Sequence, residues 1–454
     1  MAGVGISMGL GLLLAVASSA DPSTLSVVAG DAVIGQTIQA TAQLSESPNA
    51  EGEISFEVFG PEDPTCSGPA LNPAPASAPV SGEGEYLSGE FTPPEAGVYH
   101  WSAHYSGDEV GNPAADSTCS ASSTVSKASP GLTGSASAGV VNTAIHDEAT
   151  VTGGFSPTGE VIFRIYGPGD TACLTPLETD AVPLQGVNAV SANFLPQQAG
   201  EFRWTASYEG DANNEAAELP CGSANQASTV SKASPGLAGV ATSAVVVGSP
   251  ITDGVTVSGG FEAGGQLVFR AYGPGNQTCA GAAAYEATVA VAGNGSYSPA
   301  GFSPGAGLYR WTASYEGDAN NEAAELPCGS ANQASAVGTI TPTLAASATD
   351  ATVGHPVSAT ASIQEGAIPT GQITFTAFSP GDTNCSGAAA FSSTVDVSGN
   401  GSYRSAVFVP TRVGTFRWTV SYSGDPNHAA TTAGCGKATS SVSPASPSIA
   451  TDVP

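Results

Sequence analysis

The stretch Gly97-Val-Tyr-His-Trp101-Ser-Ala-His-Tyr105-Ser-Gly-Asp108 decides the fold, because it recurs three more times along the chain. The other copies run from Gly200 to Asp211, from Gly307 to Asp318 and from Gly414 to Asp425. In each copy, aromatic or small apolar residues alternate with polar ones, which is the pattern of a β-strand with one buried face. Every tryptophan of the chain lies at the same place in a copy, and we expect all of them in the core: Trp101, Trp204, Trp311 and Trp418. A repeated core strand predicts a repeated domain.

The spacing of the copies sets the domain organisation. The tryptophans recur every 103 to 107 residues, a length at which each repeat can build its own core. We expect domains at 21–128, 129–234, 235–341 and 342–446, followed at 447–454 by a linker or the start of a truncated fifth repeat. Proline marks every joint, at Pro130, Pro235, Pro342 and Pro447. Short proline-containing linkers are semi-rigid, so the sequence predicts an elongated array of four domains.

Other strands precede the tryptophan strand in each repeat. Residues 21–35 predict a first strand with its turn, and the alternation at Ile38, Ala40, Ala42 and Leu44 predicts a second. A third strand has a phenylalanine at its centre, which we expect in the core: Phe56, Phe163, Phe269 and Phe375. Two further strands follow.

An Asn-Gly pair joins these two further strands in repeats 3 and 4, at Gly293-Asn294-Gly295 and Gly399-Asn400-Gly401. Asn-Gly between apolar runs favours a type I′ hairpin, because both central residues of that turn need positive φ. The same asparagines match a glycosylation acceptor, but the turn alone explains them.

The composition favours an all-β protein. The chain has 57 glycines and 33 prolines, and only 11% of its residues are charged. Acidic residues outnumber basic ones by 39 to 10, for a net charge of −29. Such a charge makes nucleic acid and anionic membrane surfaces poor partners.

The eight cysteines fall two to a repeat: Cys66 and Cys119, Cys173 and Cys221, Cys279 and Cys328, Cys385 and Cys435. This placement predicts one disulfide bond per domain and an oxidising compartment. Zinc is disfavoured, because no Cys-x-x-Cys occurs and the histidines follow no repeat pattern. In a simple sandwich the two cysteine-bearing loops lie at opposite ends. The bond therefore requires that one of them fold back along the sheet edge.

Residues 1–20 are similar to a signal peptide, with an apolar run from Met8 to Ala17 before Ser-Ser-Ala20. The usual positive charge is missing, since no Lys or Arg precedes Lys127. Either the true start lies upstream or the sequence is a fragment. The run is too short to span a membrane, and we expect a secreted or cell-surface protein with no membrane insertion in the mature chain.

The repeats resemble known domains. Gly-x-(Tyr/Phe)-x-Trp resembles the sixth strand of immunoglobulin domains, with Tyr99, Phe202, Tyr309 and Phe416 at the corner position. Together with Tyr-(Ser/Glu)-Gly-Asp after the tryptophan, this motif makes residues 21–446 similar to the bacterial immunoglobulin-like repeat family. The resemblance implies β-sandwiches that serve as stalks, spacers and adhesive parts of larger secreted or surface proteins.

Candidate sites are few. His100, His104, His146, His355 and His428 occupy unrelated positions with no recurring nucleophile, so we expect no enzyme, cofactor or metal. The loops at Asp108, Asp211, Asp318 and Asp425 could hold calcium, but few ligands at varying spacing favour turns in which Asp accepts backbone N–H bonds. The outward arginines at 203, 310 and 417 either pair across strands or, beside Tyr166 or Tyr272, form a binding patch.

Three functions fit these observations. The first is a secreted or surface-displayed structural array of disulfide-bonded domains, whose partners are neighbouring repeats or an anchor in a longer chain. The second is an adhesin that binds a glycan or a protein. The third makes the domains accessory modules of a secreted enzyme outside this sequence.

Overall fold

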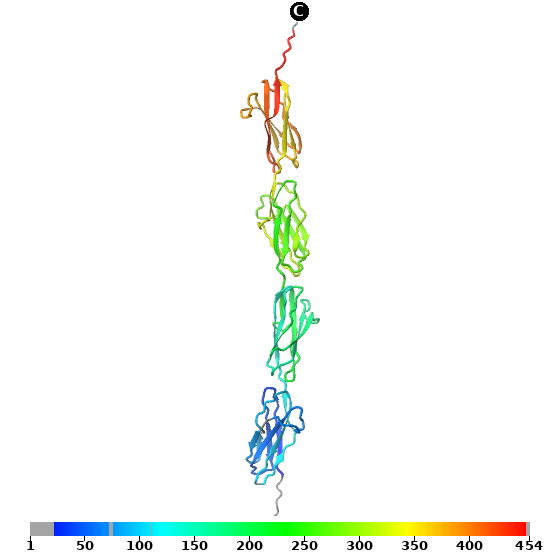
Figure 1. The fold of residues 1–454 in the computed structure, drawn as a ribbon, viewed down its shortest axis with the longest axis vertical. Helices are drawn as coiled ribbons and strands as arrows, with labels where there is room; N and C mark the ends of the chain where they lie inside the picture. The colour runs from blue at the N-terminus through cyan, green and yellow to red at the C-terminus, as the bar shows by residue number, and fades with distance from the viewer. Residues whose placement is uncertain (1–21, 72–75, 110, 451–454) are drawn as a thin grey trace, which may run out of the picture. The chain divides into compact units, whose positions relative to one another are not determined.

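The computed structural model describes residues 22–71, 76–109 and 111–450 (Figure 1). The leader-like segment 1–20 and the last four residues of the tail, 451–454, lie outside this description. The described residues form strands and no helix, arranged as four β-sandwiches. Two compact units divide the chain after Val230, with two sandwiches in each. No helix in the described ranges is long and apolar enough to cross a membrane.

Repeat 2 shows the plan of each sandwich. A three-stranded sheet has the order β10 (Gly131–Ala136), β12 (Asp147–Thr152), β15 (Asn188–Val190). The facing sheet has the order β11 (Gly139–Val140), β18 (Ala227–Ser231), β16 (Gly200–Tyr208), β13 (Glu160–Tyr166), β14 (Glu178–Pro183), with β17 (Ala217–Leu219) also on β16. The segment expected as the first strand divides into two strands that join opposite sheets. This strand order makes each repeat an immunoglobulin-like sandwich.

The other repeats have the same sheet orders. In repeat 1 the smaller sheet has the order β1 (Thr24–Ala29), β3 (Ala40–Ser45), β6 (Gly84–Leu87). The larger sheet has the order β2 (Ala32–Val33), β9 (Ala121–Ser126), β7 (Gly97–Tyr105), β4 (Glu53–Phe59), β5 (Ala76–Pro79), with β8 (Ala115–Asp116) on β7. In repeat 3 the smaller sheet has the order β19 (Gly236–Ala241), β21 (Asp253–Ser258), β24 (Gly295–Tyr297). The larger sheet has the order β20 (Ala244–Val246), β27 (Ala334–Gly338), β25 (Gly307–Tyr315), β22 (Gln266–Tyr272), β23 (Tyr285–Ala290), with β26 (Ala324–Leu326) on β25. In repeat 4 the smaller sheet has the order β28 (Thr343–Ala348), β30 (Ala359–Gln364), β33 (Gly401–Arg404). The larger sheet has the order β29 (Ala351–Thr352), β35 (Thr431–Ser443), β34 (Gly414–Tyr422), β31 (Gln372–Phe378), β32 (Ala389–Asp396).

The core of each sandwich is built on the tryptophan strand. Its alternate residues point between the sheets, and the central phenylalanine of the neighbouring strand packs beside them. The core residues expected from the repeat are all buried: Trp101, Trp204, Trp311, Trp418, Phe56, Phe163, Phe269 and Phe375. Trp101, Trp311 and Trp418 belong to three separate apolar clusters, so these repeats do not share one core.

The expected Asn-Gly hairpins are wrong. β23 pairs with β22 in one sheet, whereas β24 pairs with β21 in the other, so Gly293-Asn294-Gly295 lies in a connection that crosses between sheets. Gly293 has a positive φ of 91°, but Asn294 does not adopt the left-handed backbone of a type I′ turn. Instead the Asn294 side chain accepts a hydrogen bond from the Gly260 N–H (2.9 Å) and donates one to its carbonyl (2.7 Å). Asn400 makes the same two bonds with Gly366.

The disulfide bonds close within repeats because the chain folds back along the sheet edge. In repeat 2, β17 pairs with the end of β16 and β18 pairs with its beginning, so Cys221 between them lies beside the middle of β16. Cys173, in the loop after β13, reaches it with a Cα–Cα distance of 5.9 Å. The other bonds join Cys66 to Cys119, Cys279 to Cys328 and Cys385 to Cys435. Disulfide bonds of this number are typical of an oxidising, extracellular compartment.

Candidate functional site

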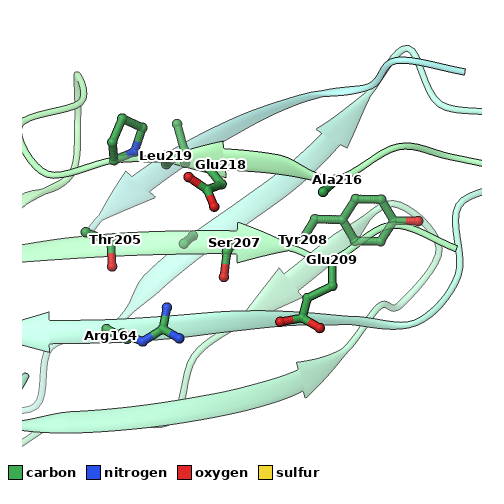
Figure 2. A pocket seen from close by; sticks show the side chains of 10 residues that line it. Arg164, Thr205, Ser207, Tyr208, Glu209, Ala216, Glu218 and Leu219 are labelled. Atoms are coloured by element: carbon green, nitrogen blue, oxygen red, sulfur yellow. The ribbon is translucent and has the colours of Figure 1, made fainter.

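A groove lies on the outer face of the larger sheet in repeat 2. It has a volume of about 520 Å³ and is lined by Arg164 of β13, by Thr205 and Ser207 of β16, by Glu209 directly after β16, and by Glu218 of β17. Figure 2 shows these side chains on one face of the sheet. Hydroxyl groups beside one guanidinium group are suited to binding a polar ligand.

Repeat 3 differs at the same place. Arg270 stands where repeat 2 has Arg164, and its Nε donates to Glu286 Oε2 across β22 and β23 (2.7 Å). In repeat 2 the strand position opposite Arg164 is Thr179, and within the described residues the Arg164 guanidinium has no carboxylate partner. Arg164 is therefore not ion-paired in the groove of repeat 2, although Glu209 and Glu218 also line that groove.

The arginine–tyrosine patch, one of the two alternatives for the outward arginines, does not form as an exposed aromatic surface. Arg203 is opposite Tyr166 and Arg310 is opposite Tyr272 in the strand register. However, Tyr166 and Tyr272 are only 5% and 7% exposed. Among the described residues, the exposed large hydrophobic side chains are all aliphatic.

The Gly-Asp loop after the tryptophan strand is the most densely hydrogen-bonded polar feature of each repeat. In repeat 2, Asp211 Oδ1 accepts the backbone N–H groups of Asn213 (2.7 Å) and Asn214 (2.8 Å) and the side-chain amide of Asn214 (2.8 Å). Its Oδ2 accepts the N–H (2.7 Å) and the hydroxyl (3.0 Å) of Thr158 and the hydroxyl of Tyr208 (3.0 Å). Asp211 therefore ties its own loop to the loop between β12 and β13.

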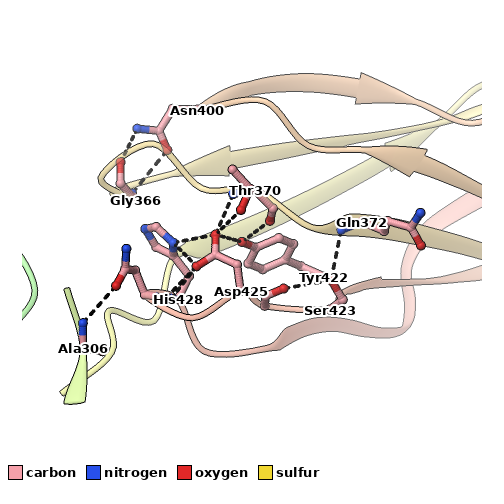
Figure 3. A network of polar contacts seen from close by, with 11 residues as sticks. Ala306, Gly366, Thr370, Gln372, Asn400, Tyr422, Ser423, Asp425 and His428 are labelled. Carbon is pink, nitrogen blue, oxygen red and sulfur yellow. Dashed lines mark hydrogen bonds and ion pairs between the residues drawn. The ribbon is translucent and has the colours of Figure 1, made fainter. Parts of the chain in front are cut away.

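Repeat 4 builds the same network with one exchange (Figure 3). Asp425 accepts from the Thr370 N–H (2.6 Å) and hydroxyl (2.9 Å) and from the Tyr422 hydroxyl (3.2 Å). His428 takes the place of the second asparagine, and its Nδ1 lies 2.8 Å from Asp425 Oδ1. The motif Tyr-x-Gly-Asp is explained by these contacts, because the tyrosine hydroxyl reaches the aspartate three residues later.

The electrostatics of these loops follow from their hydrogen bonds. Burial alone raises the pKa of Asp318, but donors from Gly264, Asn321 and Asn320 outweigh it and lower the pKa to about 2. The pKa values of Asp211 and Asp425 are lowered in the same way. Burial, followed by the neighbouring aspartate, raises the pKa of Tyr208, Tyr315 and Tyr422 to about 12.

These contacts match the turn interpretation of the loops rather than a calcium site. Both carboxylate oxygens of Asp211 are occupied by protein donors, whereas a calcium ligand needs free lone pairs. Among the described residues, no three or more His, Cys, Asp or Glu side chains gather as a metal cluster.

The same loops receive the linkers from the preceding repeat. Ala128 forms a parallel bridge with the loop of repeat 2: its N–H donates to the Asn213 carbonyl (2.9 Å), and its carbonyl accepts the Glu215 N–H (2.9 Å). The Lys127 ammonium group donates to the Asp211 carbonyl (2.6 Å). Ala233 and Ile340 form the equivalent bridges with the loops of repeats 3 and 4.

A second bond reaches past the linker. The Asn213 side-chain oxygen accepts the N–H of Ala96, which lies just before β7 in repeat 1 (2.8 Å). In the second unit the Asn427 side-chain oxygen accepts the N–H of Ala306 just before β25 (2.9 Å). The Gly-Asp loop is therefore a joint as well as a turn.

Sequence reasoning missed two kinds of residue. A buried serine accepts the indole N–H of each tryptophan at 2.9 to 3.1 Å: Ser123, Ser228, Ser335 and Ser440. An Asp or Asn three residues before the first cysteine caps the turn that carries it: Asp63, Asp170, Asn276 and Asp382. The capping residue could have been found as a recurring Asp/Asn-x-x-Cys. The serine could not, since it lies 22 to 24 residues from its tryptophan.

No family model and no curated protein matches the sequence. Among solved structures, Escherichia coli alpha-2-macroglobulin activated by porcine elastase is 12% identical over 93% of this chain and 44% of that chain, with a TM-score of 0.17. The chicken CNTN1 FN1-FN3 domains are 13% identical over 67% of this chain and 98% of that chain, with a TM-score of 0.18. The chain spans less than half the length of the macroglobulin. The strand order in each sheet, rather than these likenesses, identifies the repeats as immunoglobulin-like or fibronectin-type β-domains.

Proposed function

We propose that this chain is a non-catalytic structural array of disulfide-bonded immunoglobulin-like domains in a secreted or cell-surface protein. The hydrogen-bonded joint carries the proposal. A linker whose backbone groups are bonded to the next domain has fewer accessible orientations than a free tether. The disulfide bonds support an oxidising location, and the resemblance to bacterial immunoglobulin-like repeats supports the surface role.

Each of these joints is held by several defined hydrogen bonds. At the joint between repeats 1 and 2, Ala128 makes two backbone bonds, Lys127 makes a third and Ala96 makes a fourth. Ile340 and Ala306 repeat the backbone and asparagine bonds between repeats 3 and 4. The Asn213 side chain is the part of the loop that the turn itself does not use, because its oxygen accepts the Ala96 N–H of the preceding domain.

Distance distributions across one joint test this function. Spin labels on non-natural residues in repeats 1 and 2 of the full chain should report a narrow distribution by pulsed electron resonance. The Asn213→Ala variant should broaden it, whereas Asn276→Ala, in the disulfide loop of repeat 3, should leave it unchanged. A wild-type distribution as broad as that of a flexible tether would refute the structural array.

A second candidate function is the binding of a carboxylate-bearing glycan at the groove of repeat 2. The Arg164 guanidinium group, which is not ion-paired, favours it, because a guanidinium group among hydroxyls can form paired hydrogen bonds with a carboxylate. Glu209 and Glu218 of the same groove would have to point away from the ligand. In repeat 3 the corresponding Arg270 is neutralised by Glu286.

The internal comparison supplies the experiment. The full chain would be tested against immobilised sialylated and uronate-containing glycans. Binding should be lost in Arg164→Ala and also in Thr179→Glu, which installs the acidic partner of repeat 3 without removing the arginine. Glu286→Thr should create a second site. Equal binding by wild type and Thr179→Glu would exclude this groove.

A further inference from the structure

Repeats 2 and 3 bury a carboxyl group at a core position where repeats 1 and 4 have alanine. Asp147 and Asp253 are 0% exposed and lie at the start of β12 and β21. The equivalent residues are Ala40 and Ala359, because a serine hydroxyl accepts the backbone N–H of Asp147, Ala40 and Ala359 alike (2.9 to 3.0 Å). Neither aspartate belongs to the joints or to the groove.

Each buried carboxyl has a glutamine beside it. Gln226 Nε2 donates to Asp147 Oδ1 (3.0 Å), and Gln333 Nε2 donates to Asp253 Oδ1 (2.9 Å). The remaining oxygens of both partners are buried without a hydrogen-bond partner: Asp147 Oδ2, Gln226 Oε1, Asp253 Oδ2 and Gln333 Oε1. An ionised carboxylate and an amide oxygen can only accept hydrogen bonds, so two unpaired acceptors in one pair cost free energy.

One proton removes the conflict. A protonated carboxyl group has an O–H donor as well as an acceptor oxygen, and a carboxamide has an N–H donor and an acceptor oxygen. The two groups can then share two parallel hydrogen bonds, which satisfies both unpaired oxygens together.

Three positions change together to accommodate the pair. Gly134 and Gly239 face the glutamines, and a Cβ there would lie 2.3 and 2.2 Å from the amide nitrogens. In strand register, repeat 4 has alanine at all three places (Ala346, Ala359, Ala438), and repeat 1 has Val27, Ala40 and Ala121. A glycine, an aspartate and a glutamine thus replace three apolar side chains as a set.

We propose that Asp147 and Asp253 are held as neutral carboxylic acids, each donating an O–H hydrogen bond to the side-chain oxygen of its glutamine partner, so that repeats 2 and 3 are stabilised selectively at acidic pH. Burial raises the pKa of both groups to about 6, against the lowering effect of the glutamine bond. The backbone of Glu148 lowers the pKa of Asp147, whereas the charge of its side chain raises it. In repeat 3, Gly254 supplies the backbone effect without a side-chain charge. Charged residues on the strands packed opposite are turned outward: Glu201, Arg203 and Glu218 in repeat 2, and Arg310 and Glu325 in repeat 3.

The direction of the pH dependence follows from these values. The folded carboxyl keeps its proton up to about pH 6, whereas the unfolded one loses it near its ordinary value of 3.8. Between these limits the folded state binds more protons, so this contribution to stability is fully present below about pH 4 and is lost as the pH rises through 6. A difference of about two pKa units increases the unfolding constant of each repeat by about 100-fold. Repeats 1 and 4 lack this contribution.

Hydrogen exchange on the full chain, with its disulfide bonds intact, tests the proposal. Peptides from β16 and β25 should show opening constants that rise by about 100-fold between pH 4 and pH 7, after correction for intrinsic exchange, relative to those from β7 and β34. Asp147→Asn and Asp253→Asn should remove this dependence and raise protection at pH 7, because an asparagine amide supplies the same donor without titrating. Glu148→Gln is the matched control and should leave most of the effect in place.

A spectroscopic measurement covers the case in which an asparagine variant fails to fold. Infrared spectra of wild-type protein with isotope-labelled aspartate should contain the carbonyl stretch of a protonated acid at pH 5, and this band should disappear with a midpoint near pH 6. Absence of that band, or one pH dependence common to all four repeats, would overturn the proposal and would indicate ionised aspartates bridged by water.

Discussion

Two aspartates of repeat 3, one fully buried and one partly exposed, have opposite protonation behaviour. Asp253, in the core, has its pKa raised to about 6, whereas Asp318, in the joint loop, has its pKa lowered to about 2. Burial raises the pKa in both cases. The donors differ as well: Asp318 accepts bonds from Gly264, Tyr315, Asn320 and Asn321, whereas the donors at Asp253 are the Gln333 side chain and the Gly254 backbone.

The comparison shows that the balance between burial and hydrogen-bond donors decides the charge of a carboxyl group. Full burial with few donors raises the pKa of Asp253, whereas partial burial with several donors lowers that of Asp318, because each N–H or O–H stabilises the ionised form. The core and the joint therefore have opposite responses to pH. The loop carboxylate stabilises repeat 3 at neutral pH, and the core carboxyl stabilises it in acid.

The largest contrast should come from the same substitution at both places. Asp318→Asn should destabilise repeat 3 by about 3 kcal/mol at pH 7, because an amide nitrogen then faces backbone donors and the charge-assisted bonds are lost. Asp253→Asn should stabilise the repeat at that pH. Chemical denaturation of the full chain followed by repeat-resolved hydrogen exchange measures both. Equal effects of the two substitutions on the stability of repeat 3 would contradict the opposite protonation of Asp253 and Asp318.

Removal of one partner in the core should have a smaller effect. Gln333→Ala leaves Asp253 with no side-chain donor, and we expect a loss of roughly 2 kcal/mol at pH 7. Adding Asp253→Ala and Gly239→Ala recreates the alanine set of repeat 4 and should recover most of that loss, because replacing both partners leaves no unpaired polar group. Thermal unfolding monitored by hydrogen exchange distinguishes this recovery from simple additivity.

A buried hydrogen bond that cannot titrate sharpens the comparison further. Ser335→Ala removes the acceptor of the Trp311 indole N–H, and we expect a loss of about 1.5 kcal/mol. The loss should be the same at pH 4 and pH 7, unlike that of either aspartate variant. Ser228→Ala is the matched variant in repeat 2, and a pH-dependent loss in either repeat would contradict the assignment of the titration to the carboxyl groups.

The smallest expected effect is the acid response of the joints. The lowered pKa of Asp318 means that its contribution is present above about pH 4 and is lost as the pH falls toward 2. We expect the unfolding constant of repeat 3 to rise by about tenfold over that interval, because partial exposure weakens the effect. Acid titration of hydrogen exchange in the loop after β25 measures it. No change below pH 4 would show that the loop carboxylate is not preferentially ionised in the folded state.

Local pattern predicted what local contacts create. The alternation around Trp204 specified a strand and its buried face, since side chains alternate across a strand whatever its neighbours are. The Gly-Asp turn could also be predicted from the sequence, because Asp211 accepts hydrogen bonds from backbone groups two and three residues away. The role of the same loop as a joint was not, since the Ala96 N–H that reaches Asn213 is 117 residues distant in sequence.

The error at Asn294 has the same origin. Asn-Gly between two strands looks alike whether the strands pair with each other or with different partners, and here they join opposite sheets. The buried pair was missed because an aspartate at the start of a strand has the pattern of an exposed turn residue. Asp147 contacts Gln226, which lies 79 residues later in the sequence, only in the folded domain.

The amino-acid sequence by itself determined the repeat, the strand faces, the core aromatic residues and the oxidising character of the cysteine pattern, because each depends on periodicity or spacing along the chain. Tertiary structure decided which strands share a sheet, how the linkers bond to the next domain and which aspartates are expected to carry a proton. Those outcomes depend on contacts between segments that are distant in sequence, including the hydrogen-bond donors placed around each carboxyl group. A local sequence pattern does not predict such contacts.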